Sequence, residues 1–284
     1  MDEKMGVPTP FQWHPAFFAG IQIEFAEETM YLMFENEHQL GTKPKEIDVL
    51  IIKRDSNVPI KKNIGRIFRK YNIIEYKSPG DYLSIDDFFK VYAYACFYKS
   101  DGKKVNEIKA NEITITFVTE SYPRKVLEYL EEEYHYRIEK QEAGIYYMEA
   151  LYFPIQFLVI SQLKDENNFW LHHLTNQLTD RADAKRLLME YEKHKESNLH
   201  KSVMDMIVRA NQKLFKEDEQ MFDALLELMQ DELDARESKG ETNKLKELIG
   251  KKLQKGKTLE QIADDLEESV EVIQKLIQEI EQRD

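Results

Sequence analysis

Two apolar segments constrain the fold of this chain more than any other feature. EIDVLIIKR, residues 46–54, and NIIEYKS, residues 72–78, are each rich in isoleucine, valine or leucine over about the length of one strand. Short, continuous runs of this kind are typical of strands that are buried on both faces of a sheet. A chain that carries two of them must build a central sheet and cover both of its faces, as helices do in α/β proteins.

The segments around these runs alternate between helical and strand-like patterns. Ser84 is a suitable N-cap for the helix after the second run, and Asp86 and Asp87 are favourable in its first turn. The order helix, strand, strand, strand, helix, strand predicts an α/β core. Helices are expected over residues 15–28, 84–99 and 123–134, strands over residues 29–41 and 112–121 and once or twice within residues 144–163, and a loop over residues 55–65.

From about residue 168 onward, helical spacing dominates. We therefore expect a core over residues 1–165 and a helical C-terminal region over residues 166–284. Within that region, residues 258–280 have the apolar spacing of a helix-turn-helix pair. The exposed positions of this pair are acidic, which disfavours contact with phosphates and makes packing or self-association the better interpretation. These positions are Asp264, Asp265, Glu267, Glu268 and Glu271.

The composition bears on the cellular environment. The single cysteine, Cys96, cannot form an internal disulfide, which fits a reducing compartment. The N-terminus has no apolar run behind a basic start, so no signal peptide is expected. No stretch approaches the roughly 18 apolar residues of a membrane span. We therefore expect a cytoplasmic protein without a membrane partner.

The net charge of -13 argues against nucleic acid when it is taken alone. The charge is unevenly distributed, however, because residues 41–80 hold ten basic and four acidic residues, a local charge of +6. A basic island on an acidic chain is the pattern expected around a polyanion site, although a solvated surface is the alternative. The predicted nucleic-acid contacts from this window are Lys53, Arg54, Lys61, Lys62, Arg66, Arg69 and Lys70; Lys43, Lys45 and Lys77 complete its bases.

Three charged residues lie inside the two apolar runs, where a charge is costly unless it is paired or bound to a metal. Glu75 and Lys77 are two residues apart, so in a strand they point to the same face, and Asp48 lies in the preceding run. If the runs are neighbouring strands, Asp48 and Glu75 can converge as ligands of Mg²⁺. Lys77 would then orient the attacking water or stabilise charge on the phosphorane. A buried salt bridge without a metal is the alternative.

Other residues offer weaker signals. Glu24, on the helix expected over residues 15–28, could support the metal through a water or face solvent. Lys90 and Tyr94 are four residues apart and share a helix face, from which they could touch phosphate. The histidines, His14 among them, show no metal-ligand spacing. No phosphate-binding glycine motif is present, and Cys96 on an aromatic helix face suits the core better than a nucleophile.

Four segments of the sequence resemble those of a known protein family. The segments WHPAFFAGIQIEF, EIDVLIIKR, NIIEYKSPGDYLSIDDFFKVYAYACFYK and EITITFVTESYP resemble the PD-(D/E)xK transposase-like nucleases, most nearly the recombination-promoting nuclease (Rpn) group. The similarity covers roughly residues 11–160 and is most specific over residues 72–99. By position, the motif residues are Asp48, Glu75 and Lys77.

The resemblance implies a restriction-endonuclease-like core, in which helices flank a mixed central sheet, and divalent-metal-dependent cleavage of DNA. The helix glutamate common in this fold would be Glu24, and the Lys90 and Tyr94 pair resembles a Gln-x-x-x-Tyr element of some relatives. The chain departs from the family in two places. Ile47 rather than proline precedes Asp48, and the C-terminal Gly-Glu repeats of the group are only hinted at in residues 238–256.

We therefore expect an enzyme, a DNA endonuclease that depends on Mg²⁺ or Mn²⁺, with a link to mobile elements or recombination. DNA is its expected partner, together with a second copy of the chain bound through the helical C-terminal region. The alternative is a catalytically inactive scaffold or binding protein that keeps the nuclease fold and self-associates through its acidic helical tail. A helix-turn-helix regulator is a third option, weakened by the acidic positions of residues 258–280.

Overall fold

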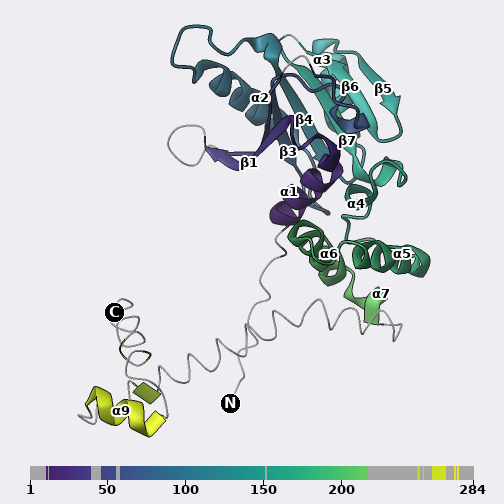
Figure 1. The fold of residues 1–284 in the computed structure, drawn as a ribbon. Coiled ribbons are helices and arrows are strands. Elements are labelled where there is room, and N and C mark those ends of the chain that lie inside the picture. The colour runs from purple at the N-terminus through teal and green to yellow at the C-terminus, as the bar shows by residue number, and fades with distance from the viewer. Residues whose placement is uncertain are drawn as a thin grey trace, which may run out of the picture. The chain divides into compact units, whose positions relative to one another are not determined.

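The computed structural model describes residues 11, 13–39, 46–55, 58–150 and 152–216, together with residues 248–249, 252, 258–266, 272 and 274. Contacts divide the chain into two units, Met1–Phe222 and Asp223–Asp284. The first unit contains the sheet and the helices up to Lys216 (Figure 1). The expected boundary at residue 165 lies inside this unit, so the described helices between residues 166 and 216 belong with the sheet.

A seven-stranded mixed sheet forms the centre of the first unit, in the order β1-β2-β3-β4-β7-β6-β5. The pairs β1/β2 and β2/β3 are antiparallel, the pairs β3/β4 and β4/β7 are parallel, and the pairs β7/β6 and β6/β5 are antiparallel. The strands are β1 Leu32–Gln39, β2 Glu46–Lys53, β3 Tyr71–Tyr76, β4 Ile113–Thr119, β5 Ile138–Glu142, β6 Ile145–Glu149 and β7 Pro154–Val159.

Helices cover both faces of the sheet, as predicted (Figure 1). Helices α2 and α3 pack on one face, where Phe88 and Leu130 join Ile73 and Phe117 in a single core. On the other face Phe17 of α1 stacks on Tyr76 of β3, with ring centroids 4.1 Å apart, and α1 in turn contacts α4 and α6. The helices of the first unit are α1 Trp13–Glu24, α2 Ile85–Ser100, α3 Arg124–Tyr134, α4 Phe169–His172, α5 Arg181–Glu192, α6 Asn198–Ala210 and α7 Gln212–Lys216.

The start of α2 follows the prediction from its sequence. Ser84 caps the helix, since its hydroxyl accepts from the backbone N–H of Asp87 at 3.0 Å. The Asp87 carboxylate accepts from the Ser84 N–H at 3.1 Å and from its hydroxyl at 2.7 Å, which completes a capping box. This cap fixes the position of Asp87 close to the end of β3.

Two elements differ from the predictions. Helix α1 ends at Glu24 and is followed by a short 3₁₀ turn over Ala26–Glu28, so the expected helix over residues 15–28 is too long. Strand β5 was not expected, because IEKQE carries three charged residues and its side chains are mostly exposed at the sheet edge. An edge strand with one solvated face has no continuous apolar run to mark it.

The second unit contains one described helix, α9, over Leu259–Leu266. Thr258 and Gln261 cap it reciprocally, through Thr258 N–H to Gln261 Oε1 at 3.1 Å and Gln261 N–H to Thr258 Oγ1 at 3.4 Å. This agrees with the first helix of the pair expected over residues 258–280. The second helix of that pair and the segment 238–256 fall mostly outside the described residues.

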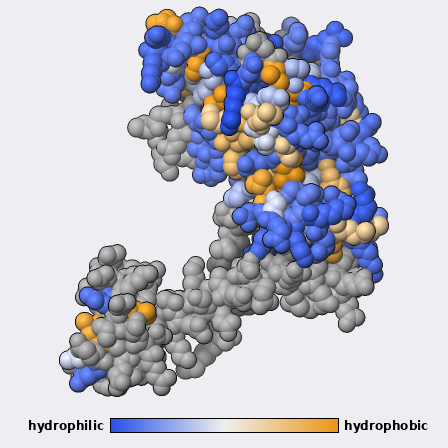
Figure 2. Space-filling model, viewed as in Figure 1, coloured by the Kyte–Doolittle hydropathy of each residue, from blue (hydrophilic) through white to orange (hydrophobic). Residues whose placement is uncertain are grey.

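The surface of the first unit is largely hydrophilic. On the face in Figure 2 hydrophilic residues predominate, and hydrophobic ones are gathered in patches between them. Within the described part of the chain, no helix combines the length and the apolar character that crossing a bilayer requires.

Candidate active site

The register of β2 and β3 brings Asp48 and Glu75 together. These strands are antiparallel and their pairing ends at Val49 and Ile74, so Asp48 and Glu75 are the next residues at this end of the two strands. The Asp48 carboxylate accepts from the backbone N–H of Tyr76, the residue after Glu75. The electrostatic coupling of the two carboxylates agrees with this placement, because the charge of Asp48 contributes to a raised pKa of Glu75.

Two ammonium groups approach Glu75. Lys77 Nζ lies 3.3 Å and Lys90 Nζ 3.4 Å from Glu75 Oε1. Lys77 lies just beyond the end of β3, where its backbone N–H donates to the carbonyl of Val118 in β4 at 2.9 Å, and Lys90 comes from the second turn of α2. Glu75 is buried, while the side chain of Lys90 is 44% exposed. The site therefore opens toward solvent on the side of α2.

Asp87 lies at the capped start of α2 and contacts both lysines. Its Oδ1 lies 3.0 Å from Lys77 Nζ and 3.5 Å from Lys90 Nζ. Burial acts to raise the pKa of Asp87, but the hydrogen bonds from Ser84 and Lys77 outweigh it and hold that pKa well below its usual range. Asp87 is therefore a permanent anion at neutral pH and a fixed partner for Lys77. Residue spacing did not predict Asp87 as part of the site, although the N-cap predicted at Ser84 placed Asp87 at the correct end of the helix.

Asp48 has two further contacts. Its Oδ2 accepts from the backbone N–H of Tyr76 at 2.9 Å, which orients the carboxylate. His14 Nε2, from the first turn of α1, lies 3.6 Å from the same oxygen, and the Asp48 carboxylate is the main cause of the raised pKa of His14. His14 and Asp48 also line a small cavity of about 230 Å³ together with Phe17. Nothing in the sequence marks His14, because it lies 34 residues from Asp48 and has no ligand spacing.

Burial is the largest influence on the pKa of Glu75. It raises that pKa, the neighbouring charge of Asp48 raises it further, and Lys90 and Lys77 lower it in part. The charged form of Glu75 is therefore held at a cost in the folded protein. A group whose ionisation is penalised by burial and by a second carboxylate is typical of sites that bind a cation or carry out acid–base chemistry.

Replacing Asp87 with alanine is expected to lower the free energy of unfolding by about 1 kcal/mol, because α2 loses its capping box. The pKa of Asp87 is depressed in the folded state, so this contribution is complete above the ordinary carboxyl pKa and is lost as the pH falls below it. Urea denaturation should therefore give a constant difference from wild type between pH 7 and about pH 5, and a shrinking difference at lower pH.

Asp86→Ala is the matched control, because Asp86 is the exposed neighbour in the same turn and accepts no capping bond there. An equal loss in the two variants would show that Asp87 acts only through the general charge of the helix start.

Glu24 lies elsewhere, and the solvent-facing alternative for it is wrong. It is 8% exposed, and its Oε1 accepts the backbone N–H groups of Trp170 and Leu171 at 3.1 Å each. Its Oε2 accepts from Lys62 Nζ, which also donates to the carbonyl of Asn167. Glu24 thus joins α1 to the start of α4, and both of its carboxylate oxygens accept hydrogen bonds there. These contacts do not support the prediction that Glu24 helps to hold a metal.

The basic window of residues 41–80 is separated from Asp48 and Glu75. The Lys53 N–H donates to the Lys70 carbonyl at 2.8 Å, which places the connecting loop at the opposite end of β2 and β3. Four or five residues of strand, about 15 Å, lie between that loop and the Asp48 end. Of the bases in the window that the structure describes, Lys77 lies at the same end of the strands as Asp48. Lys43 and Lys45 lie outside the described residues.

Several bases of the window also have partners of their own. Lys53 is 5% exposed and its burial lowers its pKa, so it does not belong to an exposed basic surface. Arg66 pairs with Glu142, and Arg69 donates to the Asn111 carbonyl at 2.6 Å. Lys70 lies over the Tyr71 ring, 5.0 Å from its centroid, while Arg54 and Lys61 are exposed. Nucleic-acid contacts from these residues stay a prediction.

The remaining expected site residue is Tyr94, which packs in part against the core under α2, one turn beyond Lys90. Among the residues that the structure describes, no three or more His, Cys, Asp or Glu side chains gather in a group that could hold a metal ion. A cation at Asp48 and Glu75 would therefore take its other ligands from water and substrate.

Comparisons of the chain with family models, with curated proteins and with solved structures gave no match.

Proposed function

We propose that the chain is a divalent-metal-dependent endonuclease that hydrolyses phosphodiester bonds of DNA, with Asp48, Glu75 and Lys77 at the reaction centre. The observation that carries the proposal is the contact of the Asp48 carboxylate with the N–H of Tyr76, next to Glu75, together with Lys77 and Lys90 against the Glu75 carboxylate. Carboxylates for a hard cation and ammonium groups for a phosphate are the two components that such a hydrolysis needs.

The order of elements supports a narrower assignment of the fold. The chain runs α1-β1-β2-β3-α2-β4, with β1, β2 and β3 antiparallel and β4 parallel to β3. We propose that this core is of the restriction-endonuclease-like kind implied by the resemblance to the PD-(D/E)xK nucleases. In that assignment β2 carries the motif aspartate and β3 the motif glutamate and lysine.

The donor set fits Mg²⁺ or Mn²⁺. Asp48 and Glu75 are the residues that would hold the ion, which commonly takes one or two carboxylates and keeps several waters. When bound, such an ion supplies a water of lowered pKa and offsets the charge of the phosphate. It would also relieve the repulsion between the two carboxylates, which is one of the causes of the raised pKa of Glu75.

The remaining residues act on the substrate and on each other. The Tyr76 N–H holds the Asp48 carboxylate, and Asp87 holds Lys77 beside Glu75. Lys77 would stabilise charge that develops on the phosphorus oxygens as the attacking water forms a new P–O bond and the bond to the leaving oxygen breaks. Lys90, which is partly exposed, would meet the non-bridging oxygens of the incoming phosphate.

One observation favours a second candidate function, a catalytically inactive binding protein that keeps the nuclease fold. Both ammonium groups lie on the same oxygen of Glu75, so the carboxylate is already neutralised within the protein. In this alternative the charged cluster is a structural ion-pair network, and the protein acts through a partner surface. Calorimetric titration with Mn²⁺ separates the two, because only the nuclease should bind the ion at Asp48 and Glu75.

Cleavage of a supercoiled plasmid tests the proposed function. The wild-type protein with Mg²⁺ is expected to give nicked and linear products, and EDTA should stop the reaction. Asp48→Ala should reduce the products to the level seen with EDTA, since it removes one of the two carboxylates. Supercoiled substrate that persists with every metal tried, or equal cleavage by wild type and Asp48→Ala, would contradict the proposal.

A further inference from the structure

A large cavity begins where the charged cluster ends. It measures about 780 Å³ and lies along the C-terminal ends of β3 and β4. The parallel register of these strands pairs Tyr76 with Val118, so the next residues along, Lys77 and Thr119, are neighbours at the C-terminal ends of these two central strands. Thr119 lines the cavity, and Gly80 on the other wall follows Lys77 by three residues. A nucleic-acid chain with a phosphate at Lys77 would therefore have this cavity beside it.

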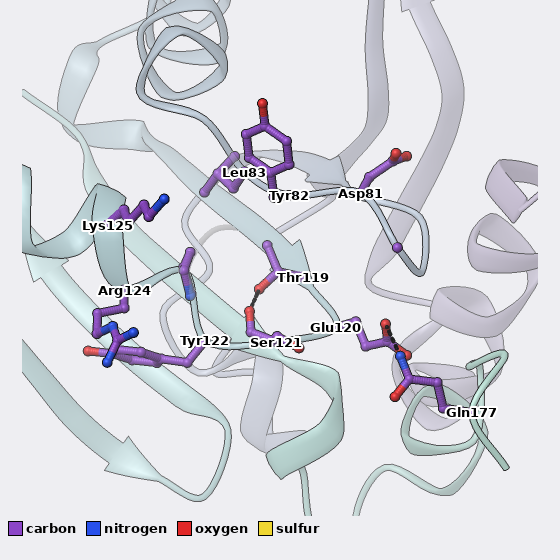
Figure 3. Close-up of a pocket in the computed structure, with 12 residues that line it drawn as sticks. Asp81, Tyr82, Leu83, Thr119, Glu120, Ser121, Tyr122, Arg124, Lys125 and Gln177 are labelled. Carbon is purple, nitrogen blue, oxygen red and sulfur yellow. Dashed lines mark hydrogen bonds between the residues drawn. The ribbon is translucent and has the colours of Figure 1, made fainter.

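The lining combines aromatic rings with cationic groups. Tyr82, from the loop before α2, is 81% exposed, and Tyr122, from the loop before α3, is 39% exposed. Arg124 and Lys125, in the first turn of α3, add two positive charges. In Figure 3 Arg124 lies beside Tyr122, Thr119 and Ser121 lie near the middle of the view, and Tyr82 stands on another side.

Two carboxylates also line the cavity. Glu120 accepts from the side chain of Gln177 at 3.3 Å (Figure 3). It also accepts from the hydroxyl of Thr175. Asp81 is exposed and would repel a phosphate. The cationic groups are therefore nearly balanced by acids, so stacking on the tyrosines rather than net charge would provide the main attraction for a nucleic acid.

The size of the cavity limits what can enter it. Its volume of about 780 Å³ is in the range of pockets that enclose one small molecule and is far less than the space that a base-paired double helix occupies. A duplex cannot enter, whereas one unpaired nucleotide fits a pocket of this size. Exposed aromatic rings next to basic side chains are how proteins bind single strands without reading their sequence.

We propose that this cavity receives an unpaired nucleotide next to the cleaved phosphate, so that the preferred substrate is single-stranded DNA or DNA with an unpaired end. The inference rests on the proposed function for the position of the phosphate at Lys77. The base would stack on Tyr82 or Tyr122, and Arg124 and Lys125 would contact the neighbouring phosphate.

The test measures binding in EDTA, where no cleavage occurs, by fluorescence anisotropy of a labelled 20-nucleotide strand and of the blunt duplex of the same sequence. The single strand should bind the full chain at least about tenfold more tightly than the duplex. Tyr82→Ala should weaken single-strand binding by roughly five- to a hundredfold, the usual range for the loss of one stacked base. Asp81→Asn should strengthen it.

Tyr152→Ala is the matched control, because Tyr152 is also exposed but precedes β7, at the opposite end of the parallel strands. It should bind like wild type. Equal affinity for strand and duplex, or equal effects of Tyr82→Ala and Tyr152→Ala, would overturn the inference.

Plasmid cleavage by the same proteins distinguishes a failure of the cavity proposal from a failure of the proposed nuclease function. Cleavage that depends on Asp48, with no role for Tyr82 in single-strand binding, would overturn the cavity proposal and leave the nuclease standing. Single-strand binding that depends on Tyr82, in a protein that cleaves nothing, would support the cavity and contradict the nuclease.

Discussion

Glu75→Gln is expected to reduce the rate of DNA cleavage by at least about a hundredfold while leaving the protein at least as stable as wild type at neutral pH. The loss in rate follows from removing a charged group from the reaction centre, where one well-placed electrostatic contact contributes about 10²–10³ to the rate. The stability follows from burial, because the folded protein holds the charged form of Glu75 at a cost that glutamine of the same shape does not carry.

The effect of Glu75→Gln on stability should depend on pH in one direction. The pKa of Glu75 is raised in the folded state, so the folded protein binds this proton more tightly than the unfolded chain does. The contribution of Glu75 to stability is therefore most favourable at low pH and is lost as the pH rises from the ordinary carboxyl range through the raised pKa. Wild type should lose stability relative to Glu75→Gln over that interval.

The measurements are single-turnover cleavage at saturating Mg²⁺ and urea denaturation between pH 4 and pH 8. Glu28→Gln is the control, since Glu28 is also buried but accepts from the Lys62 backbone N–H at 3.1 Å at the far end of the sheet. It should leave cleavage by the folded protein unchanged. A Glu75→Gln protein that cleaves like wild type would remove Glu75 from the reaction centre.

The largest expected effect on stability is that of Glu24→Ala, which should lower the free energy of unfolding by about 3 kcal/mol or more. The substitution leaves the charge of Lys62 without its carboxylate, and breaking a largely buried pair from one side typically costs about 3–5 kcal/mol. It also removes the acceptor of the Trp170 and Leu171 N–H groups, which begin α4. Cleavage by the folded fraction should persist, because Glu24 does not contact the candidate site.

Urea denaturation at pH 7 measures this loss, with Glu27→Ala as the control. Glu27 is exposed one turn further along the chain, so its removal should change the free energy of unfolding by less than about 0.5 kcal/mol. If the two variants were equally stable, the contact between α1 and α4 would not depend on Glu24. If Glu24→Ala abolished cleavage in protein that remained folded, Glu24 would act on the site after all.

Local patterns accounted for much of the fold. The two apolar runs became neighbouring strands, and the period of two along β3 placed Glu75 and Lys77 on one face. The N-cap predicted at Ser84 located the start of α2 to the residue. Each of these features depends on residues close together in the chain, where spacing alone fixes geometry.

Contacts between segments that are far apart in the chain could not be predicted from spacing. The approach of His14 to Asp48 and the engagement of Glu24 by Lys62 both arise from packing between elements far apart in the chain. The distance of the basic window from Asp48 and Glu75 has a related cause. An antiparallel connection carries its loop to one end of the strands, so residues next to Asp48 and Glu75 in sequence lie at the opposite end in space.

The most direct test of the account is a crystal structure determined after soaking with Mn²⁺, with anomalous diffraction collected to locate the metal. The account predicts an anomalous peak between the carboxylates of Asp48 and Glu75, at about 2.0–2.3 Å from an oxygen of each. The same peak should be absent from Glu75→Gln crystals soaked in the same way. A wild-type crystal without a peak there, in which Lys77 and Lys90 stay on Glu75, would contradict the proposed metal-dependent hydrolysis.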